Sequence, residues 1–118
     1  MITDETIKRI IQFTKDRDWD QFHSPENLAK SISIEAGELL ECFQWDGNHY
    51  DRQAVKEELA DVMNYCLLLS DKLDLDPDRI INEKIDQNEK KYPVEKAKGT
   101  SKKYGSVLIP VDRCTQRS

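Results

Sequence analysis

The sequence predicts an all-α domain in which four helices pack in a bundle-like arrangement. Apolar residues recur at intervals of three and four over four long segments, the period of a helix with one buried face. Two of those segments begin with a capping residue followed by proline, a common helix start, and no region is rich in strand signals. A chain of 118 residues suffices for one domain with one modest core.

The first two helices are separated by a short loop. Residues 4–18 form the first, with Thr3 as a suitable N-cap. Its apolar face consists of Ile7, Ile10, Ile11 and Thr14. Residues 18–23 break the period and predict the loop, after which Ser24–Pro25 supply the N-cap and first position of a helix ending near Gln44. Its apolar stripe consists of Leu28, Ile32, Ala36, Leu39, Leu40 and Phe43.

The third and fourth helices follow a turn at residues 46–48. The third runs from about residue 51 to 72, and steps of four and three give it a coiled-coil-like seam. That seam consists of Val55, Leu59, Val62, Cys66, Leu69 and Leu73, and the stripe beside it of Glu58, Asp61, Tyr65 and Leu68. The fourth begins at Asp76–Pro77 and ends before Pro93, because a residue preceding proline avoids helical angles. Residues 94–118 are expected to form an extended or mobile tail, with 107–111 a candidate docking strand.

Composition narrows the class of protein. Charged residues make up 35% and hydrophobic ones 37%, so the core is lean and we expect part of it to be buried between subunits. A net charge of −5 argues against binding a nucleic-acid polymer, which favours a basic surface. No apolar stretch approaches the roughly 20 residues that span a bilayer, so no membrane association is expected.

The cysteines and the N-terminus predict a soluble cytoplasmic protein. Three widely spaced cysteines without a C-x-x-C pair are typical of a reducing compartment, and we expect Cys42 and Cys66 to be small core residues. The first residues lack the basic flank and apolar run of a signal peptide.

Two acidic pairs with helical spacing are the strongest functional signal. Glu35 and Glu38, and likewise Glu58 and Asp61, stand three residues apart, so each pair lies on one helix face. Four carboxylates gathered by adjacent helices repel one another unless a cation lies among them. Hard oxygen ligands suit Mg²⁺, with Mn²⁺ as a substitute, and Mg²⁺ usually keeps positions open for substrate phosphates. The alternative is a solvated surface, because 23 of the 118 residues are acidic and such spacing arises by chance.

Five blocks in order carry a family resemblance. They are Arg17–His23 (RDWDQFH), Glu35–Leu39 (EAGEL), Phe43–Trp45 (FQW), Glu58–Val62 (ELADV) and Lys84–Pro93 (KIDQNEKKYP). Over about residues 5–105 the chain resembles the MazG-type, all-α nucleoside triphosphate pyrophosphohydrolases, and is most similar to the small single-domain members that act on dCTP. We therefore expect a domain over residues 1–105 and leave residues 106–118 unassigned.

The resemblance implies a metal site and a reaction. Glu35, Glu38, Glu58 and Asp61 would hold Mg²⁺ ions that bind the triphosphate. Cleavage between the α- and β-phosphates would yield a nucleoside monophosphate and pyrophosphate, with dCTP or a modified dCTP as the favoured substrate and removal of unwanted nucleotides as the role. By the family pattern Glu38 is also the candidate to align or deprotonate the water. The family further implies a homo-oligomer, either a dimer or a tetramer built from two dimers.

Aromatic residues near the helix ends have two interpretations. Trp19 and Trp45 either cap the end of the bundle or stack on a nucleobase, and the resemblance favours the base pocket. His23 is either an ordinary residue at a helix entry or a donor to the base or phosphate. Tyr65, one turn after Asp61, either packs under the sugar or simply lines the bundle.

Lys84 and Asn88 lie on neighbouring turns of the fourth helix. Charged residues in such a place usually form a solvated face. Both nevertheless match family positions that contact the triphosphate, which needs a positive partner. We therefore include them among the predicted substrate-binding residues.

Two other classes of protein are alternatives: a di-iron helical bundle and a non-catalytic interaction module. A carboxylate-bridged di-iron bundle requires Glu-x-x-His on facing helices, and the nearest matches, at His23 and His49, follow aspartates in predicted loops. A helical oligomerisation or interaction module would explain the apolar seam equally well, with the acids as surface charge only. It does not explain why acids, tryptophans and a Lys-Asn pair recur in the family's order.

Overall fold

The computed structural model describes residues 2–99, and within that range every regular element is helical. The elements are α1 (Asp4–Asp16), the 3₁₀-helix η1 (Asp20–Phe22), α2 (Pro25–Glu41), α3 (Arg52–Lys72), α4 (Pro77–Lys91) and α5 (Val94–Ala97). The predicted all-α class is confirmed. The chain forms two compact units, Met1–Pro77 and Asp78–Ser118, which are described separately.

Side-chain caps fix where the helices of the first unit begin. The Thr3 hydroxyl accepts a hydrogen bond from the backbone N–H of Thr6, and the Ser24 hydroxyl accepts one from Asn27. Asp51 caps α3 through its carboxylate, which accepts hydrogen bonds from the backbone N–H groups of Gln53 and Ala54. These bonds satisfy donors that a helix start leaves unpaired, and the predicted caps Thr3 and Ser24 are confirmed.

Three element boundaries differ from the prediction. Helix α2 ends at Glu41, three residues early, because the chain continues in i→i+3 bonds such as Gln44 N–H to Glu41 C=O (3.2 Å). The expected loop after α1 contains η1, which follows Asp18 in the left-handed region (φ 56°). Residues 94–97 of the expected tail form α5. The candidate strand at 107–111 and Cys114 lie outside the described residues.

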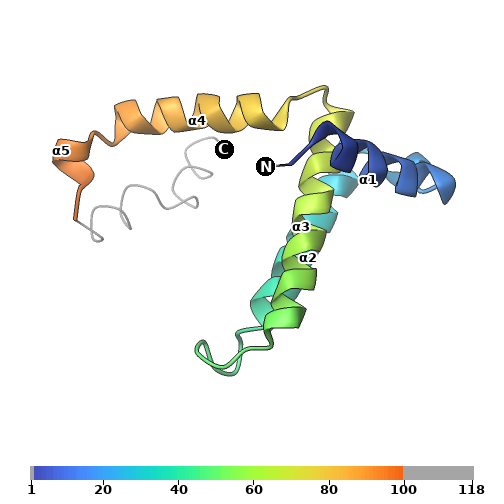
Figure 1. Ribbon diagram of the computed structural model, residues 1–118, viewed down its shortest axis with the longest axis horizontal. Coiled ribbons are helices and arrows are strands. Elements are labelled where there is room, and N and C mark those ends of the chain that lie inside the picture. The colour runs from blue at the N-terminus through green and yellow to red at the C-terminus, as the bar shows by residue number, and fades with distance from the viewer. Residues whose placement is uncertain (1, 100–118) are drawn as a thin grey trace. The chain divides into compact units, whose positions relative to one another are not determined.

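Helices α2 and α3 form an antiparallel hairpin, and α1 lies across α3 near its C-terminal end (Figure 1). The fully buried apolar side chain is Leu28 of α2, at 0% exposure, and Leu67 and Leu68 of α3 are also buried. From α1, Thr14 is buried and its hydroxyl donates to the Ile11 carbonyl (2.7 Å). The described core is therefore small and lies where the three helices meet.

The predicted seam of α3 is only partly internal. Val55, Val62 and Leu69 are half-buried, but Leu59, Cys66 and Leu73 are exposed. The expectation of Cys66 as a core residue is therefore wrong, and Cys42 is half-buried. On α2, Ala36 and Leu40 are exposed, whereas Glu35 is half-buried. Periodicity identifies apolar positions but not which of them a neighbour within the same chain covers.

The second unit contains α4 and α5. Along α4 the Arg79 guanidinium pairs with Glu83 (2.9 Å), and the apolar side chains of Ile80, Ile81 and Ile85 are exposed. The helix ends before Pro93 as predicted, with the Tyr92 N–H bonded to the Asn88 carbonyl (2.8 Å). In the part of the chain that the structure describes, no helix is both long and apolar enough to cross a membrane.

Candidate functional site

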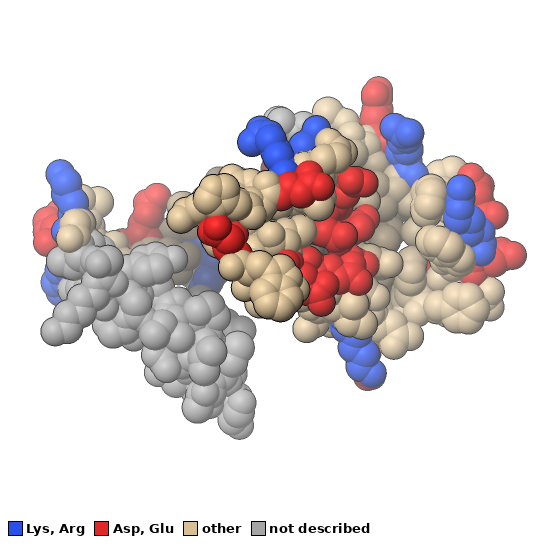
Figure 2. Space-filling model, turned by 90° about the horizontal axis from the view of Figure 1, so that it is seen from below, with Lys and Arg blue, Asp and Glu red and all other residues tan. Residues whose placement is uncertain are grey.

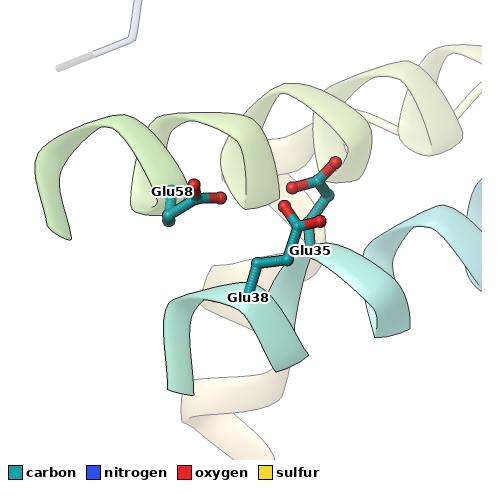
Figure 3. Close-up of side chains that lie close together, drawn as sticks. All are labelled: Glu35, Glu38 and Glu58. Atoms are coloured by element: carbon teal, nitrogen blue, oxygen red, sulfur yellow. The ribbon is translucent and has the colours of Figure 1, made fainter. Parts of the chain in front are cut away.

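Three of the four predicted metal ligands converge between α2 and α3. Glu35 and Glu38 stand one turn apart on α2, and Glu58 faces them from α3 (Figure 3). Each offers a carboxylate oxygen, and these oxygens lie within 4.8 Å of one another. The helical spacing predicted from the sequence therefore brings together side chains from segments twenty residues apart or more. We call these three residues the carboxylate cluster.

Burial and mutual repulsion perturb the carboxylate cluster. Glu35 Oε2 and Glu58 Oε2 are buried without a hydrogen-bond partner among the described residues. The pKa of Glu35 is raised to about 7. The largest cause is burial, followed by hydrogen bonding with Glu38 and then by the negative charges of Glu38, Asp61 and Glu58. The pKa of Glu58 is raised by burial first and then by Glu38 and Asp61. A carboxylate in this position gains from a cation.

The donor set fits a hard divalent cation. Within residues 2–99 no ion pair neutralises any member of the carboxylate cluster, and no histidine joins the group. Buried, unpartnered oxygens in an all-oxygen set suit Mg²⁺ or Mn²⁺, whereas a di-iron site would require histidine. Acidic side chains also gather in the middle of the face seen in Figure 2, with basic ones at their upper edge and toward the periphery.

Asp61, the fourth predicted ligand, connects the carboxylate cluster to a cavity. Its oxygens are not part of the three-residue group, but its charge raises the pKa of Glu35 and Glu58. It also lines a cavity of about 500 Å³ between α1 and α3, a volume typical of small-molecule sites. The lining residues are Thr6, Arg9, Ile10, Phe13, Thr14, Trp19, His23, Asp61, Asn64, Tyr65 and Leu68.

Backbone and side-chain contacts hold the segment around η1 against the cavity. The Trp19 N–H bonds to the Thr14 carbonyl (2.9 Å), which ties the segment to the end of α1. The Asn27 side-chain amide donates to the Phe22 carbonyl (3.0 Å). From the far end of α3, the Lys72 ammonium pairs with Asp20 (2.9 Å). Trp19 and His23, at the two ends of this segment, are thereby placed on the cavity wall.

Aromatic rings form much of that wall. The Phe13 and Trp19 rings meet edge to face with centroids 5.6 Å apart, and the His23 and Tyr65 rings do so at 6.3 Å. His23 Nδ1 is buried without a partner among the described residues. Burial, together with neighbouring acids including Asp61, raises the pKa of Tyr65. This combination of aromatic faces and unsatisfied polar atoms suits a flat heteroaromatic group.

The other predicted substrate-binding residues lie elsewhere. Trp45 is in the loop between α2 and α3, is 90% exposed and is not part of the cavity. Lys84 and Asn88 are half-buried on α4, in the second unit, and the Asn88 side-chain oxygen is buried without a hydrogen bond to a described residue. Their roles stay predictions.

Sequence reasoning missed the contribution of α1 to the cavity. We interpreted that helix only as a packing element, yet Thr6, Arg9 and Phe13 line the cavity. An Arg-x-x-x-Phe spacing places a cation and an aromatic ring on one face of the helix, but it does not indicate that this face lies at a cavity. Asn64, three residues after Asp61, was missed for the same reason.

The arrangement defines a class of protein: an all-α domain with a cluster of carboxylates that could hold a cation, beside an aromatic-lined cavity. The chain belongs to the MazG-like family, whose model matches residues 30–107.

Similar proteins agree with this assignment. The chain is 38% identical over 110 residues to dCTP pyrophosphatase 1 of Rattus norvegicus and, over the same length, to that of Homo sapiens. These matches cover 85% of this chain but 65% of each relative, so the chain spans just under two thirds of their length. A solved pyrophosphatase from Archaeoglobus fulgidus is also similar, with a TM-score of 0.68 and 38% identity over 76% of this chain and 91% of that one.

Proposed function

We propose that this protein is a divalent-cation-dependent nucleoside triphosphate pyrophosphohydrolase. It cleaves a (deoxy)nucleoside triphosphate, with dCTP or a modified dCTP as the favoured substrate, into the monophosphate and pyrophosphate. The observation that supports this most is the carboxylate cluster, with buried unpartnered oxygens, beside the aromatic-lined cavity. The printed names of the relatives, dCTP pyrophosphatase 1, support the choice of substrate.

The cation site would be formed by Glu35, Glu38, Glu58 and Asp61, with Mg²⁺ as the natural ion and Mn²⁺ as a substitute. When bound, such an ion would neutralise the charge of the phosphates and lower the pKa of a water molecule that it coordinates. The side chains themselves pre-arrange this site, because α2 and α3 hold the oxygens together at the cost of repulsion.

Glu38 is the proposed general base. It is exposed, unlike the half-buried Glu35 and Glu58, and its carboxylate oxygen lies within 4.8 Å of an oxygen of each. In the proposed reaction a water oxygen bonds to the α-phosphorus as the bond from that phosphorus to the bridging oxygen breaks. Pyrophosphate leaves with the bridging oxygen, and Glu38 accepts the proton of the water. No covalent enzyme intermediate is required.

The cavity would bind the nucleoside. Trp19 and Tyr65 offer aromatic surfaces for the base and sugar, and His23 offers a buried ring nitrogen without a protein partner among the described residues. Stacking on such surfaces contributes about 1–3 kcal/mol per base. We include Trp45, Lys84 and Asn88 as further substrate contacts on the strength of the family pattern alone.

We further propose a cytoplasmic homo-oligomer, either a dimer or a tetramer built from two dimers, with its catalytic domain in residues 1–105. Apolar side chains that remain exposed, among them Leu59 and Met63 of α3, support an additional protein interface. The net charge of −5 is consistent with a nucleotide, rather than a nucleic-acid polymer, as the ligand.

Pyrophosphate release from each deoxynucleoside triphosphate, measured with Mg²⁺, with Mn²⁺ and with EDTA, tests the proposal. We expect metal-dependent turnover with dCTP preferred. Absence of turnover of every triphosphate at micromolar enzyme would instead favour the helical interaction module. A panel that includes 5-substituted dCTP defines the tolerated base modifications.

A further inference from the structure

Two polar side chains that line the cavity, one on α1 and one on α3, have no hydrogen-bond or ion-pair partner among the described residues. Arg9 of α1 and Asn64 of α3 both line it, and neither forms a hydrogen bond or ion pair with another residue in the range 2–99. The nearby Arg17 behaves differently, since its guanidinium donates to the Phe13 carbonyl (3.0 Å) and stacks on the Phe13 ring (3.7 Å). Arg9 is therefore available to a ligand, whereas Arg17 is used by the fold.

Arg9 belongs to the aromatic end of the cavity. It precedes Phe13 by four residues, so both lie on the same face of α1, and Phe13 in turn contacts Trp19. Arg9 therefore lines the cavity together with these aromatic rings, whereas the carboxylate cluster lies between α2 and α3. This places Arg9 among the residues proposed to bind the nucleoside, not among those proposed to hold the phosphate-binding cation.

The chemistry of a guanidinium limits which bases suit it. Arginine only donates hydrogen bonds, and its planar fork matches two parallel acceptors. Cytosine offers such a pair in O2 and N3, and guanine in O6 and N7. Uracil and thymine place an N–H donor between their two carbonyl oxygens, and adenine places an amino group beside N1 and N7. A forked contact therefore separates cytosine from uracil, which has the same size.

We propose that Arg9 and Asn64 determine base selectivity, with Arg9 donating to O2 and N3 of cytosine and the Asn64 side-chain oxygen accepting from its amino group. This rests on the proposed function and deepens it. The contacts involve one edge of the ring, and C5 lies on the other. A substituent at C5 therefore leaves recognition intact, and 5-modified dCTP belongs to the same substrate class.

Steady-state kinetics with dCTP and dUTP tests the assignment, because the two bases differ only at the edge in question. In Arg9→Met we expect the ratio of kcat/KM for dCTP to that for dUTP to fall on the order of 10- to 100-fold, through loss with dCTP. Arg9→Lys, which keeps the charge without the fork, should also lose selectivity. Asn64→Leu should lower the ratio and abolish the advantage of dCTP over its analogue that lacks the amino group. Lys8→Met, beside Arg9 but outside the cavity lining, is the matched control and should keep the wild-type ratio.

Retained turnover of dUTP shows that a variant is folded and active. An equal loss with both triphosphates in Arg9→Met and Arg9→Lys would indicate a phosphate contact and overturn the proposal, as would an unchanged ratio. Inactivity of the wild-type protein toward all triphosphates would instead contradict the proposed function, so the two failures are distinguishable.

Discussion

At the scale of single residues, the carboxyl group of Glu35 has a strongly raised pKa. Its pKa of about 7 means that the folded protein retains a proton that the unfolded chain releases near pH 4.5. Glu58 is shifted in the same direction. Between these pH values the folded state binds more protons than the unfolded state, so the free energy of unfolding falls as pH rises.

We therefore predict that the metal-free protein loses stability as pH rises from about 4.5 through 7. Mg²⁺ should raise the melting temperature more at pH 8 than at pH 5.5, because protons compete with the ion at low pH. Thermal unfolding in EDTA and in Mg²⁺ across this range measures both effects. Glu35→Gln should flatten the pH dependence in EDTA, and a slope unchanged by that substitution would contradict the assignment.

Carboxylates of the proposed site should be dispensable for folding but not for turnover. Glu38→Gln and Asp61→Asn are nearly isosteric and each removes a repelling charge, so we predict loss of activity by a factor of at least about 100 with the melting temperature maintained or raised. Glu41→Gln is the matched control, since Glu41 is exposed on α2 and outside the carboxylate cluster. Full activity in both site variants would exclude the site.

At the scale of elements, one ion pair joins the cavity segment to α3. Lys72 and Asp20 are 52 residues apart, their partnership lowers the pKa of Asp20, and the neighbouring Trp19 lines the cavity. The pair is partly exposed, so its effect on stability is small. Its position beside a cavity residue suggests a larger effect on substrate binding than on folding.

Lys72→Met should therefore raise KM for the preferred triphosphate severalfold while changing kcat less. Lys72→Arg should restore the wild-type KM because it keeps the ion pair. Lys56→Met provides the control, because Lys56 is exposed on the same helix and forms no ion pair with a described residue. A KM that is equally altered by Lys56→Met would show that the tether has no specific role.

Sequence signals predicted these elements unevenly, for physical reasons. The starts of α1 and α2 were predictable because Thr3 and Ser24 bond to backbone N–H groups within three residues. The clustering of Glu35, Glu38 and Glu58 also followed from helix period and adjacency. Arg9 and Asn64 were not predictable as cavity residues, because that role depends on where α1 crosses α3. Local spacing contains no such long-range information.

At the scale of the whole molecule, large apolar side chains on several helices are exposed among the described residues. The described core contains few fully buried side chains, whereas Leu59 is 40% exposed and Met63 48% exposed. These two lie one turn apart on α3, and the exposed Cys66 continues the same face. Three of the six residues of the predicted seam, Leu59, Cys66 and Leu73, are thus exposed in this chain.

We predict that sedimentation at micromolar concentration will show a dimer or tetramer. If the exposed face of α3 with Leu59 and Met63 forms the subunit interface, Met63→Glu places an unpaired charge in it. This substitution should weaken association at least about tenfold. Lys56→Glu changes charge on the same helix at an exposed polar position and should leave the assembly intact. Helical content measured by circular dichroism should fall together with assembly, because the small core within one chain provides few buried contacts. A wild-type protein that sediments as a stable, folded monomer would show that this face of α3 is not an interface.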